Sequence, residues 1–321
     1  MKRILSIVMI VMIVMLPAYA FAQALSLNHV GATDHPYHDG ALKFAELVEE
    51  YTGGSLTVDV FPASQIASGA KAIEFVQMYT LDIALESTMS FSNFVPEVGV
   101  LDLPFLFSTK EEAFKVLDGE VGAKLNELAE EKGFKVLGWW DNGFRNITST
   151  KGAIEKPDDL KGLKIRTPES TVFLVTFETL GAVPTPMAVS EVFSALQLGT
   201  VDAQENPDNN NLKNKYTEIC PYYSITKHIY TAEPLVMNLD RFNSFTPEEQ
   251  EALLRAGKEA GDYQREVSLA LDETNMQTII DTGVAVNIVE DMTPFQEACQ
   301  PVYEAFADRF GDLITMIQEA K

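Results

Sequence analysis

The sequence predicts an α/β protein of two domains that share one long helix. Segments with strand-like and helix-like hydrophobic patterns alternate through both halves of the chain. Once residues 1–22 are set aside, 299 residues remain, enough for two domains of about 150 residues each. Such alternation favours mostly parallel sheets with helices on both faces, and ligand sites beyond the carboxyl ends of the strands.

The first half of the chain has the pattern of a β-α-β-α-β series. Residues 25–30 alternate between apolar and polar side chains as a strand does, and a helical stretch through residues 44–48 ends at Gly53 and Gly54. The next predicted elements are a strand at 56–61, a helix at 70–78, a strand at 81–86 and a helix around 110–132.

The second half repeats this alternation and ends in the long helix. Its predicted elements are strands at 135–140 and 163–166, helices at 172–180 and 190–198, a short strand at 201–202 and a sheet-forming stretch at 228–239. Residues 247–281 then show a helical pattern with no internal proline and only two glycines, Gly257 and Gly261. At 1.5 Å per residue this helix would extend roughly 50 Å, more than the width of one domain, so we expect it to lie across both.

The N-terminus has the pattern of a secretory signal peptide. Lys2 and Arg3 precede an apolar run at 4–16, and Pro17 and small residues follow it. We expect cleavage after Ala22 and a periplasmic location, with an uncleaved anchor as the alternative. No cysteine directly follows the apolar run, as a lipoprotein anchor would require.

Only two cysteines, Cys220 and Cys299, occur in the chain. In an oxidising compartment they could form a disulfide bond, and they could equally be two separate buried thiols, since cysteine packs as a small apolar residue. Sequence spacing does not decide between these alternatives.

The charge balance limits the possible partners. The chain carries 24 lysines and arginines against 47 acidic residues, a formal net charge of −23. Binding to nucleic acid or to an anionic membrane surface is disfavoured, because both need a basic surface. A small anion is also repelled by the summed charge, so an anionic ligand requires arginines placed locally at its site.

Common enzyme motifs are absent from the sequence. It contains no nucleophile elbow, Walker loop, dinucleotide-binding glycine motif or zinc-protease motif. The segment at 34–39 contains His35, His38 and two aspartates and could be drawn as a metal cluster, but a polar loop around Pro36 explains it as well. We therefore predict a protein that is not an enzyme and holds neither cofactor nor metal.

Two arginines and one asparagine are the strongest candidates for ligand contacts. Arg145 follows a strand that carries Trp139 and Trp140, and Arg166 ends its strand just before Pro168. The guanidinium group matches a carboxylate with two parallel hydrogen bonds, although either arginine could instead form a structural ion pair. Asn206 closes a polar loop after a strand and offers both donor and acceptor.

The chain resembles the periplasmic substrate-binding proteins of TRAP transporters, the family that includes dicarboxylate and sialic acid receptors. The likeness covers essentially the whole chain after the signal segment, and it is carried by residues 43–46, 61–66, 102–107, 143–145, 160–168 and 184–207. The chain departs from the family pattern in two places. Ala203 replaces a common glycine, and residues 67–71 lack the acidic ligand contact that many members carry.

The resemblance implies two hinged α/β domains that close on a ligand in the cleft between them. Domain I would comprise residues 23–142 plus about 232–271, and domain II about 143–231 plus 272–321. Arg166 falls on the arginine that takes the ligand carboxylate, Arg145 on a second arginine, and Asn206 on a supporting asparagine. Weaker expectations for hydroxyl contacts fall on Glu86, Ser90, His29 and His35.

The resemblance therefore implies capture of a small organic acid for a sodium-driven membrane permease of the TRAP type. We expect a monomer that binds a hydroxylated sugar acid such as a uronate. The alternatives are a C4-dicarboxylate, an amino acid or aromatic acid walled by Trp139 and Trp140, a secreted enzyme using Glu86 with His35, and a receptor that feeds a membrane sensor.

Overall fold

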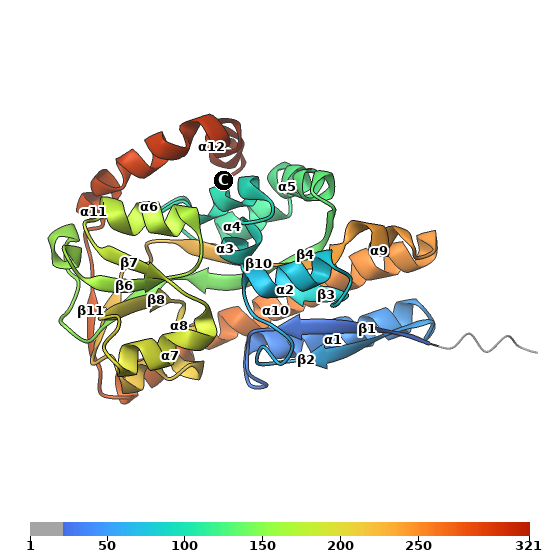
Figure 1. Cartoon of the computed structure of the whole chain (residues 1–321), viewed down its shortest axis with the longest axis horizontal. Helices are drawn as coiled ribbons and strands as arrows, with labels where there is room; N and C mark the ends of the chain where they lie inside the picture. Colours follow the sequence, from blue (N-terminus) through green and yellow to red (C-terminus); the bar gives the residue numbers. More distant parts are fainter. Residues whose placement is uncertain (1–21) are drawn as a thin grey trace, which may run out of the picture.

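The computed structural model describes residues 22–321 and contains two mixed sheets (Figure 1). The predicted signal peptide lies outside the described residues, except for Ala22. The first sheet has the strand order β2-β1-β3-β10-β4, and the second has the order β11-β9-β5-β8-β6-β7. The predicted α/β class is confirmed, but the sheets are less parallel than expected, because β10 and β5 each run antiparallel to both neighbours.

The first sheet and its helices come mainly from the first half of the chain. The strands are β1 (Gln23–His29), β2 (Leu56–Phe61), β3 (Ile83–Leu85), β4 (Phe134–Phe144) and the returning β10 (Tyr230–Asn238). The helices are α1 (Pro36–Tyr51), α2 (Ala70–Gln77), α3 (Thr88–Phe91), η1 (Pro96–Asp102), α4 (Lys110–Leu117) and α5 (Glu120–Glu131). The single helix expected around 110–132 is thus two helices, because Gly119 is extended and caps α5.

The second sheet comes from the middle of the chain and one late strand. Its strands are β5 (Asn146–Ser149), β6 (Lys164–Thr167), β7 (Val183–Pro186), β8 (Ala203–Asn206), β9 (Tyr222–Ile225) and β11 (Ala285–Ile288). The accompanying helices are η2 (Pro157–Leu160), α6 (Thr171–Thr179), α7 (Val189–Gln197), α8 (Asp208–Lys213) and η3 (Tyr216–Glu218). The strand expected at 201–202 begins later, because the amide of Val201 still bonds back to the Ala195 carbonyl of α7.

The long helix α10 (Pro247–Asp281) has the predicted bounds and follows α9 (Leu239–Asn243). It begins at a capping box in which the Thr246 side chain accepts from the Glu249 amide. It contacts α1 and β4 at the first sheet and α8 beside the second. A Cβ on Gly257 would lie 2.3 Å from the Leu137 carbonyl oxygen, so only glycine allows α10 to approach β4 this closely.

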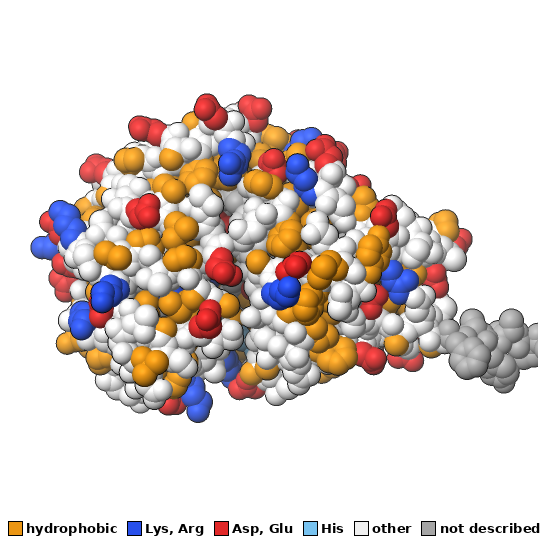
Figure 2. Space-filling model, in the orientation of Figure 1, with side chains coloured by type: hydrophobic (Ala, Val, Ile, Leu, Met, Phe, Trp, Pro, Cys, Tyr) orange, Lys and Arg blue, Asp and Glu red, His pale blue; other side chains and the backbone are white. Residues whose placement is uncertain are grey.

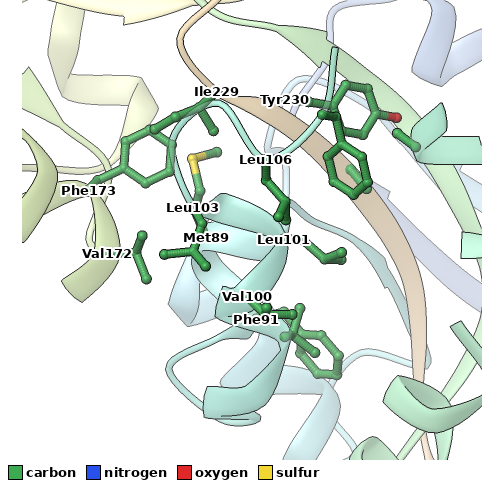
Figure 3. Close-up of a cluster of buried hydrophobic side chains, with 14 of the residues drawn as sticks. Met89, Phe91, Val100, Leu101, Leu103, Leu106, Val172, Phe173, Ile229 and Tyr230 are labelled. Atoms are coloured by element: carbon green, nitrogen blue, oxygen red, sulfur yellow. The ribbon is translucent and has the colours of Figure 1, made fainter. Parts of the chain in front are cut away.

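The largest hydrophobic core joins elements that flank both sheets. Figure 3 shows Met89, Leu103 and Ile229 beside Val172 and Phe173 of α6. The C-terminal helices, α11 (Thr293–Ala298) and α12 (Gln300–Ala320), complete this region. Because α12 contacts α4, α5 and η1 as well as α6, it touches elements of both predicted domains, and the domain bounds stay a prediction.

Cys220 and Cys299 are both free and buried, so the disulfide alternative is wrong. Cys220 belongs to a small cluster with residues of α7, whereas Cys299 belongs to the large core. Burial raises the pKa of the Cys220 thiol to about 11, and each thiol packs as an apolar side chain.

Candidate ligand-binding cleft

Arg145 lies between β4 and β5 and is completely buried. Its Nε donates to Glu205 Oε2 at 2.5 Å and its Nη2 to Glu205 Oε1 at 2.9 Å, a bidentate ion pair. Nη2 also donates to Asn206 Oδ1 at 3.0 Å, while Nη1 is buried without a hydrogen-bond partner among the described residues. Arg145 therefore holds a fixed orientation and keeps one guanidinium nitrogen free for another acceptor.

Glu205, the acidic residue of β8, supplies the negative charge that stabilises the buried Arg145. Burial opposes ionisation of Glu205, but Arg145 and His228 outweigh it and hold the pKa of this carboxyl below its usual range. His228 Nε2 lies 3.3 Å from Glu205 Oε2, and its Nδ1 lies 2.7 Å from Thr226 Oγ1. The ion pair with Glu205 therefore supports the fold. The sequence analysis gave this structural role of Arg145 only as the alternative to ligand binding.

Arg166 lies in β6 next to β8, so the chain places its guanidinium on the same cleft as Arg145. Its Nε and Nη2 donate to the Met187 carbonyl at 3.1 and 2.7 Å. Burial lowers the pKa of Arg166 to about 10, which leaves the group charged at neutral pH. Unlike Arg145, it forms no ion pair with a carboxylate of residues 22–321, so its charge is available to a ligand.

Asn206 ends β8 and is held from both sides. Its Nδ2 donates to Gln204 Oε1 at 2.6 Å, and its Oδ1 accepts from Arg145. The side chain lines the cleft. Asn206 thus orients Arg145, and both ends of its amide group are already hydrogen-bonded.

The opposite wall of the cleft comes from the first sheet. Glu86 and Ser90 lie after β3, Glu233 lies in β10, and His35 caps α1. Together with the two arginines they line a cleft with about 750 Å³ of empty space, including its opening to solvent.

The structure thus brings together six of the seven predicted site residues; the residues that line the cleft are Arg145, Arg166, Asn206, Glu86, Ser90 and His35. His29 does not line it. Its Nε2 lies 3.2 Å from Nδ1 of His38 in α1, and burial lowers the pKa of His29 to about 3. The roles of these residues in ligand binding stay predictions.

Sequence reasoning missed Glu233 and Asn210, which also line the cleft. The signal for Glu233 was a lone carboxyl in the otherwise uncharged stretch that became β10, where every residue is buried. Trp139 and Trp140 are buried and absent from the cleft lining, so the idea of an aromatic wall has no support.

On the face in Figure 2, basic side chains are scattered among acidic ones and form no continuous patch. None of the helices within residues 22–321 has the length and apolar character needed to span a membrane.

Residues 27–309 match the model of the bacterial extracellular solute-binding proteins, family 7. The chain belongs to this family. The 2,3-diketo-L-gulonate-binding periplasmic protein YiaO of Escherichia coli is 36% identical over 91% of this chain and 86% of its own length. The C4-dicarboxylate-binding periplasmic protein DctP of Rhodobacter capsulatus is 34% identical over 92% of this chain and 90% of its own.

Among solved structures, a TRAP periplasmic solute-binding protein from Roseobacter denitrificans with bound β-D-glucuronate has a TM-score of 0.89. It is 32% identical, and the match covers 93% of this chain and 99% of the other. This family 7 protein is therefore a solute-binding receptor and not an enzyme, as the missing enzyme motifs indicated.

Proposed function

We propose that this family 7 protein is a periplasmic receptor that captures a sugar acid and delivers it to a TRAP-type sodium-coupled permease. The single observation that carries the proposal is the pair of arginines, Arg145 and Arg166, on one cleft of a strongly acidic protein. Among residues 22–321, Arg166 forms no ion pair with a carboxylate, and the buried Nη1 of Arg145 has no hydrogen-bond partner. These two donors are suited to one carboxylate.

The opposite wall favours a ligand that also carries hydroxyl groups. Glu86, Ser90 and Glu233 offer acceptors and donors to hydroxyls, whereas a purely apolar acid would leave the two buried carboxyl groups without further partners. Two relatives bind diketogulonate and glucuronate, and each of these ligands combines one carboxylate with several further oxygen atoms.

Contacts across the mouth of the cleft support a closing motion on the ligand. His35 Nε2 bonds to Asn210, and Lys213 Nζ lies 2.7 Å from Asp34, so residues of the first half meet residues of α8. A ligand that contacts both walls favours the closed form over the open one, which the permease can then recognise. Signal-peptide cleavage after Ala22 and a monomeric state belong to the same proposal.

A thermal-shift screen against organic acids tests this function. Sugar acids such as D-glucuronate and D-galacturonate should raise the melting temperature, because a ligand at 100 times its Kd adds about 2.7 kcal/mol to the free energy of unfolding. Neutral sugars of the same size are the control. The absence of a shift with every acid in the screen would contradict the proposal.

The second candidate ligand is a C4-dicarboxylate. The Rhodobacter capsulatus relative is named for binding it, and its 34% identity is close to that of the diketogulonate receptor. Including succinate and malate in the same screen separates the two candidates.

A further inference from the structure

The wall of the cleft that faces the arginines carries two buried carboxyl groups, Glu86 and Glu233. Each side chain is about 2% exposed, and each lines the cleft. Glu86 Oε1 and Glu233 Oε2 are both buried without a hydrogen-bond partner among the described residues. Buried polar atoms are nearly always bonded, so these two oxygens indicate a partner that enters the cleft from outside.

Glu233 is the better ordered of the two. The Tyr37 hydroxyl donates to its Oε1 at 2.7 Å, and the neighbouring residues of β10 are buried on both sides. Tyr37 therefore fixes the carboxyl group, which leaves the second oxygen, Oε2, as the unbonded atom. Glu86 lies just after β3, the strand that pairs with β10, and its amide donates to the Pro234 carbonyl.

The two carboxyl groups make this wall unable to accept more negative charge. Burial raises the pKa of Glu233 to about 8, although Tyr37 and Arg145 oppose the change and Asp102 and Asp141 add to it. Burial, followed by the charge of Glu233, raises the pKa of Glu86 well above its usual value. A ligand carboxylate at this wall would be buried beside two acids whose own ionisation is already unfavourable, and no lysine or arginine of this wall lines the cleft among residues 22–321.

We propose that Glu233, together with Glu86, determines the ligand class of the cleft: these carboxyl groups exchange hydrogen bonds with the hydroxyls of a monocarboxylic acid and exclude a dicarboxylate. This inference rests on the proposed receptor function. A hydroxyl donates to an ionised carboxylate oxygen and accepts from a protonated carboxyl, so it fits either state of the pair. The arginines hold the carboxylate end, and the two glutamates select what lies at the other end.

Isothermal titration calorimetry at pH 7 tests the inference with D-glucuronate and succinate as probes. The wild type should bind D-glucuronate and should bind succinate at least about 100-fold more weakly. Glu233→Gln keeps the size of the side chain and its bond to Tyr37 but replaces the carboxyl group with an amide that cannot ionise. It should weaken D-glucuronate binding by about 2- to 10-fold, the range for a hydrogen bond between neutral groups, and strengthen succinate binding, because the amide cannot ionise beside the second carboxylate.

The matched control is Asp102→Asn. Asp102 is another buried carboxyl, with one oxygen that has no hydrogen-bond partner among residues 22–321 and a pKa raised by burial to about 7, but it does not line the cleft. This variant should leave the preference for D-glucuronate over succinate unchanged. Glu86→Gln provides a second test of the same wall if Glu233→Gln does not fold.

The outcomes distinguish the specificity role of Glu233 from the receptor function itself. If the wild type binds both acids equally, or if neither glutamine variant changes the ratio of affinities, the specificity role is wrong and the receptor function stands. If the wild type binds no organic acid at all, the receptor function itself fails. A loss of the preference in Asp102→Asn as well would assign the effect to the general charge of the domain instead of to Glu233.

Discussion

His35 Nε2 and Asn210 Oδ1 lie 3.0 Å apart and join the two walls of the cleft. His35 accepts the Tyr37 amide with Nδ1 and so caps α1, which leaves Nε2 as the ring nitrogen that donates to Asn210. Burial lowers the pKa of His35 to about 4, so the ring is neutral and this tautomer is the one present at neutral pH. One imidazole thus caps the N-terminus of α1 in one wall and donates a hydrogen bond to the other wall.

Replacing Asn210 should make ligand release faster. Asn210→Ala removes the bond across the mouth and leaves the helix cap of His35 intact. A neutral hydrogen bond contributes about 0.5–1.5 kcal/mol, so the dissociation rate should rise about 2- to 10-fold. Stopped-flow fluorescence measures this rate. Asn243→Ala, at an exposed asparagine of α9, is the control, and an unchanged rate in Asn210→Ala would mean that the contact does not hold the cleft closed.

Arg166→Ala should abolish tight ligand binding without unfolding the chain. The side chain donates only to the Met187 carbonyl and has no ion-pair partner among residues 22–321, so its removal leaves no carboxylate buried alone. Calorimetric titration and circular dichroism measure the two effects separately. Arg309→Ala, an exposed arginine of α12, should behave as wild type. Near-wild-type affinity in Arg166→Ala would overturn its assignment as the carboxylate ligand.

Arg145→Met should instead destabilise the fold itself. It leaves Glu205 as an uncompensated buried charge, a change that typically costs about 3–5 kcal/mol. The double variant Arg145→Met with Glu205→Gln should recover part of this loss, because the remaining amide is neutral. Urea unfolding of the three proteins gives the free energies. A double variant no more stable than Arg145→Met would show that the charge is not the cause.

Gly257→Ala should destabilise the protein, whereas Gly311→Ala should not. An added Cβ at Gly257 meets the backbone of β4, and overpacking of this kind costs about 1–3 kcal/mol. Gly311 also lies in a helix, but nothing surrounds its position within 4 Å, so alanine there should stabilise by about 0.5–1 kcal/mol. Thermal unfolding checks both. Equal effects would mean that helix propensity, not the close approach, decides the outcome.

Glu233 should make the protein less stable as pH rises. Its pKa is about 8 in the folded state and 4.5 as a reference, so between these values only the folded state keeps the proton. The stability it contributes is complete below pH 4.5 and is lost as pH rises through 8. Between pH 5 and pH 8 the melting temperature of Glu233→Gln should therefore change less in this direction than that of the wild type.

Calorimetric scans at the two pH values measure this difference, and Glu155→Gln, at an exposed carboxyl, should follow the wild type. Asp102, whose pKa is raised to about 7, acts in the same direction, and the lowered pKa of His35 acts oppositely below pH 6.5. Both are present in every protein compared, so they cancel. An identical change in wild type and Glu233→Gln would contradict the raised pKa.

Local patterns predicted the long helix and most of the strands correctly, since proline, glycine and hydrophobic period act over a few residues. Residues 247–281 are helical to the predicted bounds. The predictions were wrong where distant or geometric effects decide. Hydrophobic period did not reveal the break at Gly119 inside 110–132, and the late start of β8 depends on Val201 bonding back to α7.

For the site, the sequence by itself determined the ligand charge. Its motifs indicated Arg145, Arg166 and Asn206 as contacts in a protein too acidic to attract an anion elsewhere, and the fold places all three on one cleft. Only the tertiary structure decided that Arg145 is already paired with Glu205 and that Glu233 lines the cleft. Both facts join residues 60 or more positions apart, and burial of those charges depends on packing that no local pattern encodes.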